Sequence, residues 1–136
     1  MRRLVLDQKE RVGEFAKALI PHVPSWGEWY VAIGYEQDGD LIAGVVYNLY
    51  SGADIAMHVA GVGANWLSRS YLRAAFRYPF VQLGCRRVSG FVPATNVAAQ
   101  RFDEHIGFRR EGYMRHALPD DDVIVYGMLR EDCRWL

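Results

Sequence analysis

The sequence predicts an α+β fold in which flanking helices cover a mixed, mainly antiparallel sheet. Strand-like and helix-like patterns follow one another in the order strand, helix, three strands, helix, strand, helix and two strands. The strand, helix and strand between Asp54 and Val92 form a right-handed crossover unit, so those two strands are expected to be parallel neighbours in an otherwise antiparallel sheet. A length of 136 residues, with 51% hydrophobic and 24% charged residues, suits one globular domain with a buried core. We therefore expect residues 1–136 to fold as a single domain.

The first half of the chain is predicted to contain one helix and four strands. Apolar residues recur at helical spacing between Gln8 and Ile20, and Pro21 closes that helix. Asp38 and Gly39 suit a tight turn with positive φ, so the second and third strands are expected to form a hairpin. The four strands are predicted at residues 4–6, 29–36, 41–50 and 54–60.

The second half is predicted to contain two helices and three strands. The first helix begins near Leu67, and Pro79 bends or ends it. Asn96 is placed to cap the start of the second helix, and Gly107 suits a left-handed stop at its end. The strands are predicted at residues 87–92, 108–115 and 123–129, with a turn at residues 119–122 between the last two.

The net charge is zero, yet the charges are segregated along the chain. Residues 1–60 and 119–136 each carry a net charge of −3, whereas residues 61–118 carry +6. Arginine provides 14 of the 16 basic side chains, and its planar group matches the geometry of phosphate. The middle segment is therefore either an anion-binding region or a set of solvated helix faces.

Neither metal binding nor export is predicted. Cys85 and Cys133 lack metal-type spacing, so we expect two reduced structural thiols. The N-terminus lacks the apolar stretch of a signal peptide, and no uncharged apolar run is long enough to cross a membrane. We expect a cytoplasmic protein that does not bind membranes.

From Tyr78 onward the sequence resembles the GCN5-related N-acetyltransferase (GNAT) superfamily. The pattern Asn-x-x-Ala-x-Arg-x-x-Glu-x-x-Gly-Phe-x-x-Glu-Gly-x-x-Arg, from Asn96 to Arg115, carries the resemblance. It is nearest to the branch that acetylates ribosomal-protein N-termini and to small phage or prophage members. The resemblance implies that the strands at residues 54–60 and 87–92 splay apart, with acetyl-coenzyme A between them, and that acetyl is transferred to an amine acceptor.

The resemblance also implies which residues hold the cofactor. Backbone groups of the splayed strand pair with the pantetheine arm, and the helix start that follows the strand faces the diphosphate. Trp66 stands where the family has a small residue, so its indole either occupies the phosphate side of the loop or packs on the sheet. The candidate cofactor-binding residues are Val59, Gly61, Gly63, Ala64, Asn65, Ser68, Arg69 and Asn96.

His58 is the candidate catalytic base, because an imidazole on the splayed strand can accept a proton at neutral pH. Asp54, Glu28 or a carboxylate acting through water are alternatives, and His58 is otherwise a hydrogen-bonded strand residue. A backbone N–H near Val59 is the expected oxyanion donor.

The proton donor for the departing thiolate is the open question in the sequence. Asp103 and Ala99 occupy the positions at which the family often carries a hydroxyl. The remaining sources of that proton are water, Tyr71 or Tyr113.

We therefore expect an N-acetyltransferase that uses acetyl-coenzyme A and an amine acceptor. One alternative is a catalytically degenerate binding module with the same fold. A second is a phage-type modifier of a nucleic acid or a nucleic-acid-bound protein, which ranks last because no basic run is interleaved with aromatic residues. One aromatic set either lines the acceptor pocket or forms core or a homodimer interface: Trp26, Trp29, Tyr47 and Tyr50.

Overall fold

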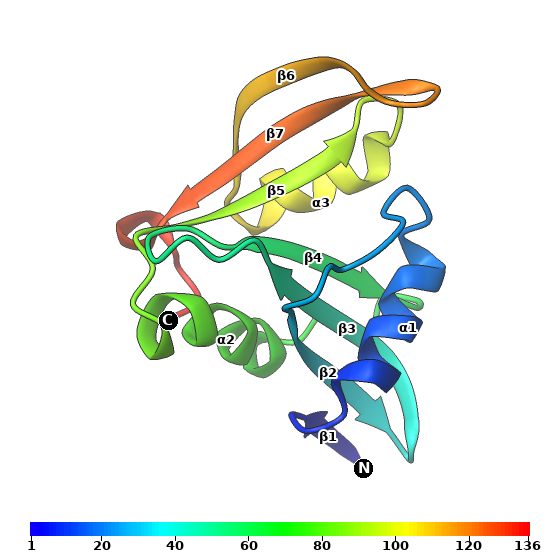
Figure 1. Cartoon of the computed structure of the whole chain (residues 1–136). Coiled ribbons are helices and arrows are strands. Elements are labelled where there is room, and N and C mark those ends of the chain that lie inside the picture. Colours follow the sequence, from blue (N-terminus) through cyan, green and yellow to red (C-terminus); the bar gives the residue numbers. More distant parts are fainter.

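Seven strands form one mixed sheet in the order β1-β2-β3-β4-β5-β7-β6 (Figure 1). The computed structural model describes residues 1–136. The strands are β1 (Arg2–Val5), β2 (Val31–Gln37), β3 (Asp40–Asn48), β4 (Ala56–Gly61), β5 (Arg87–Pro93), β6 (Arg109–Leu118) and β7 (Asp121–Leu129). The helices are α1 (Lys9–Leu19), α2 (Arg69–Arg77) and α3 (Val97–Ile106), with short helical turns at Tyr78–Gln82 and Arg130–Asp132. The predicted α+β class and element order are confirmed.

β4 and β5 are the only parallel pair in the sheet, and they pair at a single position, Ala56 with Ser89. All other neighbouring strands are antiparallel. β5 instead pairs along its whole length with β7, so the sheet consists of two halves that meet only where β4 and β5 begin (Figure 1). The splayed parallel pair that the resemblance implied is therefore present.

The helices cover opposite faces of the sheet. Neighbouring residues of a strand point to opposite faces, and Val45 and Val46 of β3 accordingly belong to different cores. Val45 packs in the larger core with Phe76 of α2 and Ile106 of α3, whereas Val46 packs with Val12 of α1. No helix is long and apolar enough to cross a membrane.

The predicted turns and caps agree with the structure. Asp38 and Gly39 have φ values of 54° and 90° in the β2–β3 hairpin, and Gly107 ends α3 with a φ of 117°. α2 ends at Arg77, and Pro79 lies in the π-helical turn that follows, because proline has no N–H to continue an α-helix.

The turn between β6 and β7 is shorter than predicted. β7 begins at Asp121, which pairs with Leu118, so Pro119 and Asp120 alone separate the strands. The Asp122 carboxylate accepts a hydrogen bond from the His116 N–H at 2.6 Å, which holds this irregular end of the hairpin together.

Candidate functional site

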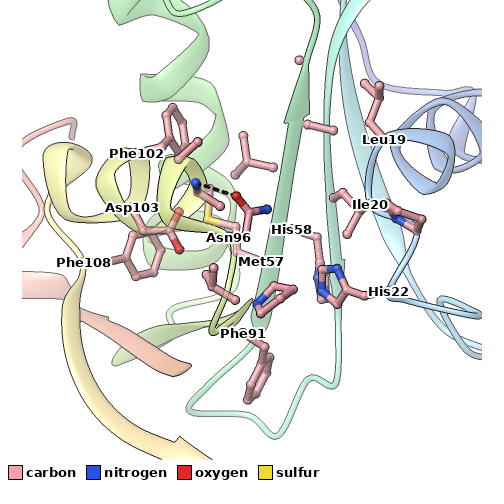
Figure 2. A pocket seen from close by; sticks show the side chains of 18 of the residues that line it. Leu19, Ile20, His22, Met57, His58, Phe91, Asn96, Phe102, Asp103 and Phe108 are labelled. Carbon is pink, nitrogen blue, oxygen red and sulfur yellow. Dashed lines mark hydrogen bonds between the residues drawn. The ribbon is translucent and has the colours of Figure 1, made fainter. Parts of the chain in front are cut away.

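A pocket of about 590 Å³ lies where β4 and β5 diverge (Figure 2). β4, the end of β5, α3 and the residues that follow α1 enclose it, and most of the lining side chains are apolar. Such a mainly apolar pocket with few polar groups is typical of a small-molecule site. It is lined by Leu19, Ile20, Pro21, His22, Met57, His58, Val59, Ala60, Gly61, Trp66, Phe91, Val92, Pro93, Thr95, Asn96, Ala98, Ala99, Phe102, Asp103 and Phe108.

The backbone of β4 presents free hydrogen-bonding groups to this pocket. The Ser89 N–H donates to the Ile55 carbonyl oxygen at 2.9 Å, so Ile55 directs its backbone groups toward β5. Alternate residues of a strand direct their backbone groups to the same side, which places those of Met57 and Val59 on that side too. The bridge between Ala56 and Ser89 engages the Met57 N–H, but beyond it β5 has turned away, so an extended chain could pair with the Met57 carbonyl oxygen and with Val59 as an additional strand would.

The loop between β4 and α2 also has free backbone donors. The N–H groups of the four residues from Gly63 to Trp66 donate to no acceptor within the protein. Gly63 has a φ of 70°, and successive N–H groups around such a left-handed residue form a concave surface suited to anions. The Ser68 side chain accepts a hydrogen bond from the Tyr71 N–H at 3.2 Å and so caps the start of α2.

Trp66 packs beneath this loop. Its side chain is only 8% exposed, and its Nε1 donates to the Gly63 carbonyl oxygen at 2.8 Å. The indole lies so close to Gly61 that a Cβ on that residue would overlap with it. The structure thus supports the packing alternative for Trp66, with the indole holding the loop from the side of the sheet.

The pocket brings together four of the residues selected from the sequence: His58, Val59, Gly61 and Asn96. The other five do not line it. They lie on the loop and at the start of α2, and are Gly63, Ala64, Asn65, Ser68 and Arg69.

Two of those five have other partners. The Asn65 carbonyl oxygen accepts a hydrogen bond from the Arg2 guanidinium at 2.6 Å. The Arg69 guanidinium lies 5.7 Å from the ring centroid of Trp135, near the end of the chain. Arg2 therefore places positive charge beside the loop, and Arg69 adds a second positive charge at the start of α2.

Asn96 combines a cap with a free amide. Its Oδ1 accepts a hydrogen bond from the Ala99 N–H at 3.1 Å, as predicted for the start of α3. Its Nδ2 has no partner within the protein and lies in the pocket wall (Figure 2). The side chain can therefore cap the helix and donate to a ligand at the same time.

Hydrogen bonds determine which nitrogen of His58 carries its proton. The Asn48 Nδ2 donates to the Trp26 carbonyl oxygen at 3.1 Å, so the Asn48 Oδ1 faces His58 as an acceptor. His58 Nε2 lies 2.9 Å from that oxygen and must carry the hydrogen, which leaves Nδ1 as a proton acceptor. Burial, and secondarily the nearby His22, lowers the pKa of His58 to about 4, so its imidazole is neutral at pH 7.

Two ionisable side chains of the pocket were not selected from the sequence as site residues. His22 lies beside His58 in the pocket, and burial lowers its pKa (Figure 2). Nothing in the local sequence distinguishes His22, which stands between two prolines after α1. Asp103 provides the pocket's carboxyl group. It follows Asn96 by seven residues, which is two helical turns, so this spacing was a signal that both side chains lie on the pocket face of α3.

The alternative catalytic residues lie elsewhere. Asp54 accepts a hydrogen bond from Ser89 where β4 and β5 meet, and Glu28 is exposed and outside the pocket. The Tyr71 hydroxyl is buried and donates to the Ile33 carbonyl oxygen at 2.8 Å. The Tyr113 hydroxyl donates to Asp122 at 2.5 Å on the surface. Neither tyrosine reaches the pocket.

The aromatic set also lies outside the pocket lining. Trp26 and Tyr47 are core residues, although the Trp26 ring is 5.0 Å from that of His58. Trp29 and Tyr50 stack on each other at 5.9 Å on the surface. Of the two alternatives for this set, core therefore holds for Trp26 and Tyr47, and the residues after α1 occupy the pocket wall instead.

No protein-family model and no curated protein matches the sequence. Solved structures with the same arrangement include acetyltransferases, and the chain has the GCN5-related N-acetyltransferase fold. A variant of the spermidine N-acetyltransferase SpeG from Vibrio cholerae superposes with a TM-score of 0.79 at 14% identity, covering 98% of this chain and 97% of that one. A probable acetyltransferase gives a TM-score of 0.72 at 18% identity, covering 96% and 93%. The nearer likeness to the ribosomal-protein and phage branches stays a prediction.

Proposed function

We propose that the protein is an N-acetyltransferase that uses acetyl-coenzyme A and an amine acceptor. One observation carries the proposal: β4 and β5 pair only at Ala56 and Ser89, and then diverge around a pocket faced by the Met57 carbonyl oxygen and the backbone groups of Val59. An extended, amide-containing arm is the kind of ligand that such a strand edge recognises. The GNAT fold supports the same conclusion.

The residues present fit the cofactor. The amides of the pantetheine arm would pair with Met57 and Val59, and with the free Nδ2 of Asn96. The N–H groups of residues 63–66 and the start of α2 would face the diphosphate, with Arg2 beside the loop and Arg69 at the start of α2. When bound, acetyl-coenzyme A would supply an acetyl group activated as a thioester.

The protein's own groups would promote attack by the amine. His58 Nδ1 accepts the proton that the amine loses, and Asn48 orients the imidazole for this role. The Val59 N–H, directed into the pocket, donates to the oxygen on which negative charge develops. Because no Lys or Arg lines the pocket, a positively charged amine would enter without repulsion.

Isothermal titration calorimetry with acetyl-coenzyme A and with free coenzyme A tests whether the protein binds the cofactor. Turnover is tested by the release of coenzyme A in the presence of hydroxylamine, which is a small amine-type acceptor. We expect both binding and turnover. Heat without turnover would favour the degenerate binding module, and the absence of heat at millimolar ligand would contradict the cofactor assignment. Binding of oligonucleotides that weakens steeply with salt would favour the nucleic-acid alternative.

Asn96→Ser provides the matched variant for this test. Serine also caps helices, so α3 should keep its stability, whereas the amide donor is lost. We expect weaker binding of coenzyme A with an unchanged free energy of unfolding. Unchanged affinity would show that Asn96 is a cap alone.

A further inference from the structure

Asp103 is the one carboxylate in the pocket wall, and its carboxyl group has no hydrogen-bond or ion-pair partner within the protein. It lies on the same face of α3 as Asn96, two turns further along the helix. Its Oδ2 lies 3.4 Å from the point that a Cβ on Gly90 would occupy. The absence of a side chain on Gly90 thus lets the carboxyl group lie against β5 (Figure 2).

The surroundings of this carboxyl group disfavour its charged form. Phe102 and Phe108 lie beside it in the pocket wall (Figure 2). Burial, and secondarily the negative charge of Glu104, raises the pKa of Asp103 from 3.8 to about 7. Asp103 is therefore partly protonated at neutral pH.

The charged groups on neighbouring elements do not neutralise Asp103. Arg110 of β6 lies 3.8 Å from Glu104, and the Tyr126 hydroxyl of β7 donates to Glu104 at 2.6 Å. Both groups therefore interact with the solvent-facing carboxylate next to Asp103. Across the pocket, β4 presents His58, which is neutral at pH 7.

We propose that Asp103 donates the proton that the departing thiolate takes up, a role that rests on the proposed acetyltransferase function. The acceptor nitrogen forms a bond to the carbonyl carbon, and the carbon–sulfur bond breaks with its electron pair on sulfur. The Asp103 proton then passes to sulfur and gives the free thiol. Solvent returns a proton to the Asp103 carboxylate, while the proton lost by the amine leaves through His58.

The acidity of Asp103 suits this transfer. The thiol of cysteine has a pKa of about 8.5, so a proton moves favourably to a thiolate of this basicity or higher from an acid with a pKa of about 7. An ordinary aspartic acid would already be ionised at pH 7 and would have no proton to donate. A raised carboxyl pKa thus provides the proton donor for which the sequence suggested no hydroxyl.

The first test needs no turnover and uses Asp103→Asn, which keeps the shape of the side chain. The pKa of the thiol of bound coenzyme A is measured from the ultraviolet absorbance of its thiolate. A negative Asp103 next to sulfur raises that pKa, so we expect it to be about one unit higher in the wild type than in Asp103→Asn. Equal values in the two proteins would overturn the proposal, because Asp103 would then lie away from sulfur.

The second test measures the pH dependence of coenzyme A release with hydroxylamine. The wild-type rate should fall as the pH rises through about 7, since the acid must be protonated. Asp103→Asn should lose this decrease and be slowed about 100-fold or more. Glu104→Gln is the control: it keeps the proton donor and should keep the decrease, shifted to lower pH.

The outcomes separate the two proposals. A wild-type protein that neither binds coenzyme A nor accelerates its release overturns both. If the wild type is active and Asp103→Asn keeps its rate and its pH profile, the acetyltransferase stands and the role of Asp103 is overturned.

Discussion

The Ser89 hydroxyl lies 2.8 and 2.9 Å from the two carboxylate oxygens of Asp54, at the point where the two halves of the sheet meet. Ser89 is also the residue of β5 that pairs with β4. Arg87 adds to this joint, with its Nε 3.4 Å from Asp54 and its Nη2 2.8 Å from Glu111. Polar side chains thus join the strands at the single position from which they diverge.

Asp54→Ala should destabilise the protein, because the buried Ser89 hydroxyl loses its acceptor and Arg87 loses one of its two carboxylate partners. We expect the free energy of unfolding to fall by about 1–3 kcal/mol in urea denaturation. Asp120→Ala, in the exposed turn between β6 and β7, is the control and should change it by less than about 0.5 kcal/mol. Equal effects of the two substitutions would show that the joint contributes nothing.

Asn48→Asp should raise the pKa of His58 from about 4, because a carboxylate in place of the amide oxygen, 2.9 Å from Nε2, favours the imidazolium. An NMR titration of the His58 ring measures the change. Asn65→Asp, in the exposed loop, should leave the titration unaltered. A His58 pKa that stays near 4 in Asn48→Asp would contradict the assigned hydrogen bond.

Gly61→Ala should cost stability and weaken coenzyme A binding, since the added methyl group overlaps with Trp66 and displaces the indole that holds Gly63. Gly63→Ala provides the comparison: no atom lies near the added Cβ, and the cost of about 1 kcal/mol comes only from its positive φ. We expect Gly61→Ala to lower the melting temperature more. The reverse order would contradict the packing of Trp66 against Gly61.

Asp103→Asn should stabilise the protein at pH 8. The pKa of Asp103 is about 7 in the folded state and 3.8 as the ordinary value, so the wild type loses stability as the pH rises from about 4 to 7. The three-unit shift corresponds to about 4 kcal/mol as an upper figure, and asparagine removes this loss. Urea denaturation of both proteins at pH 4 and pH 8 measures this stabilisation. If the free energies of unfolding of the wild type and Asp103→Asn differ by the same amount at both pH values, the raised pKa is contradicted.

The sequence predicted the fold because each element is determined by local patterns. Asp38 and Gly39 define a turn through their backbone preferences, and Asn96 and Gly107 define the two ends of α3. The parallel neighbours followed from the crossover rule, which needs only the order of the elements.

The site was predicted less completely, because its chemistry depends on tertiary surroundings. Asp103 has a high pKa because the fold buries much of its side chain and places the charge of Glu104 nearby, and no sequence pattern reports that burial. His22 reaches the pocket because the chain after α1 turns back toward β4. The packing of Trp66 could not be predicted without the position of Gly61, because the indole packs against the site where Gly61 has no side chain.

The order of strands in the sheet differs from their order in the chain, with a consequence for folding during synthesis. β1 to β4 are neighbours in both orders and can pair as they leave the ribosome. β7 is made last but lies between β5 and β6, so neither of those strands has its antiparallel partner until the chain is almost complete. The wall that carries His58 can therefore form early, whereas the wall that carries Asp103 is fixed only when β7 has folded into place.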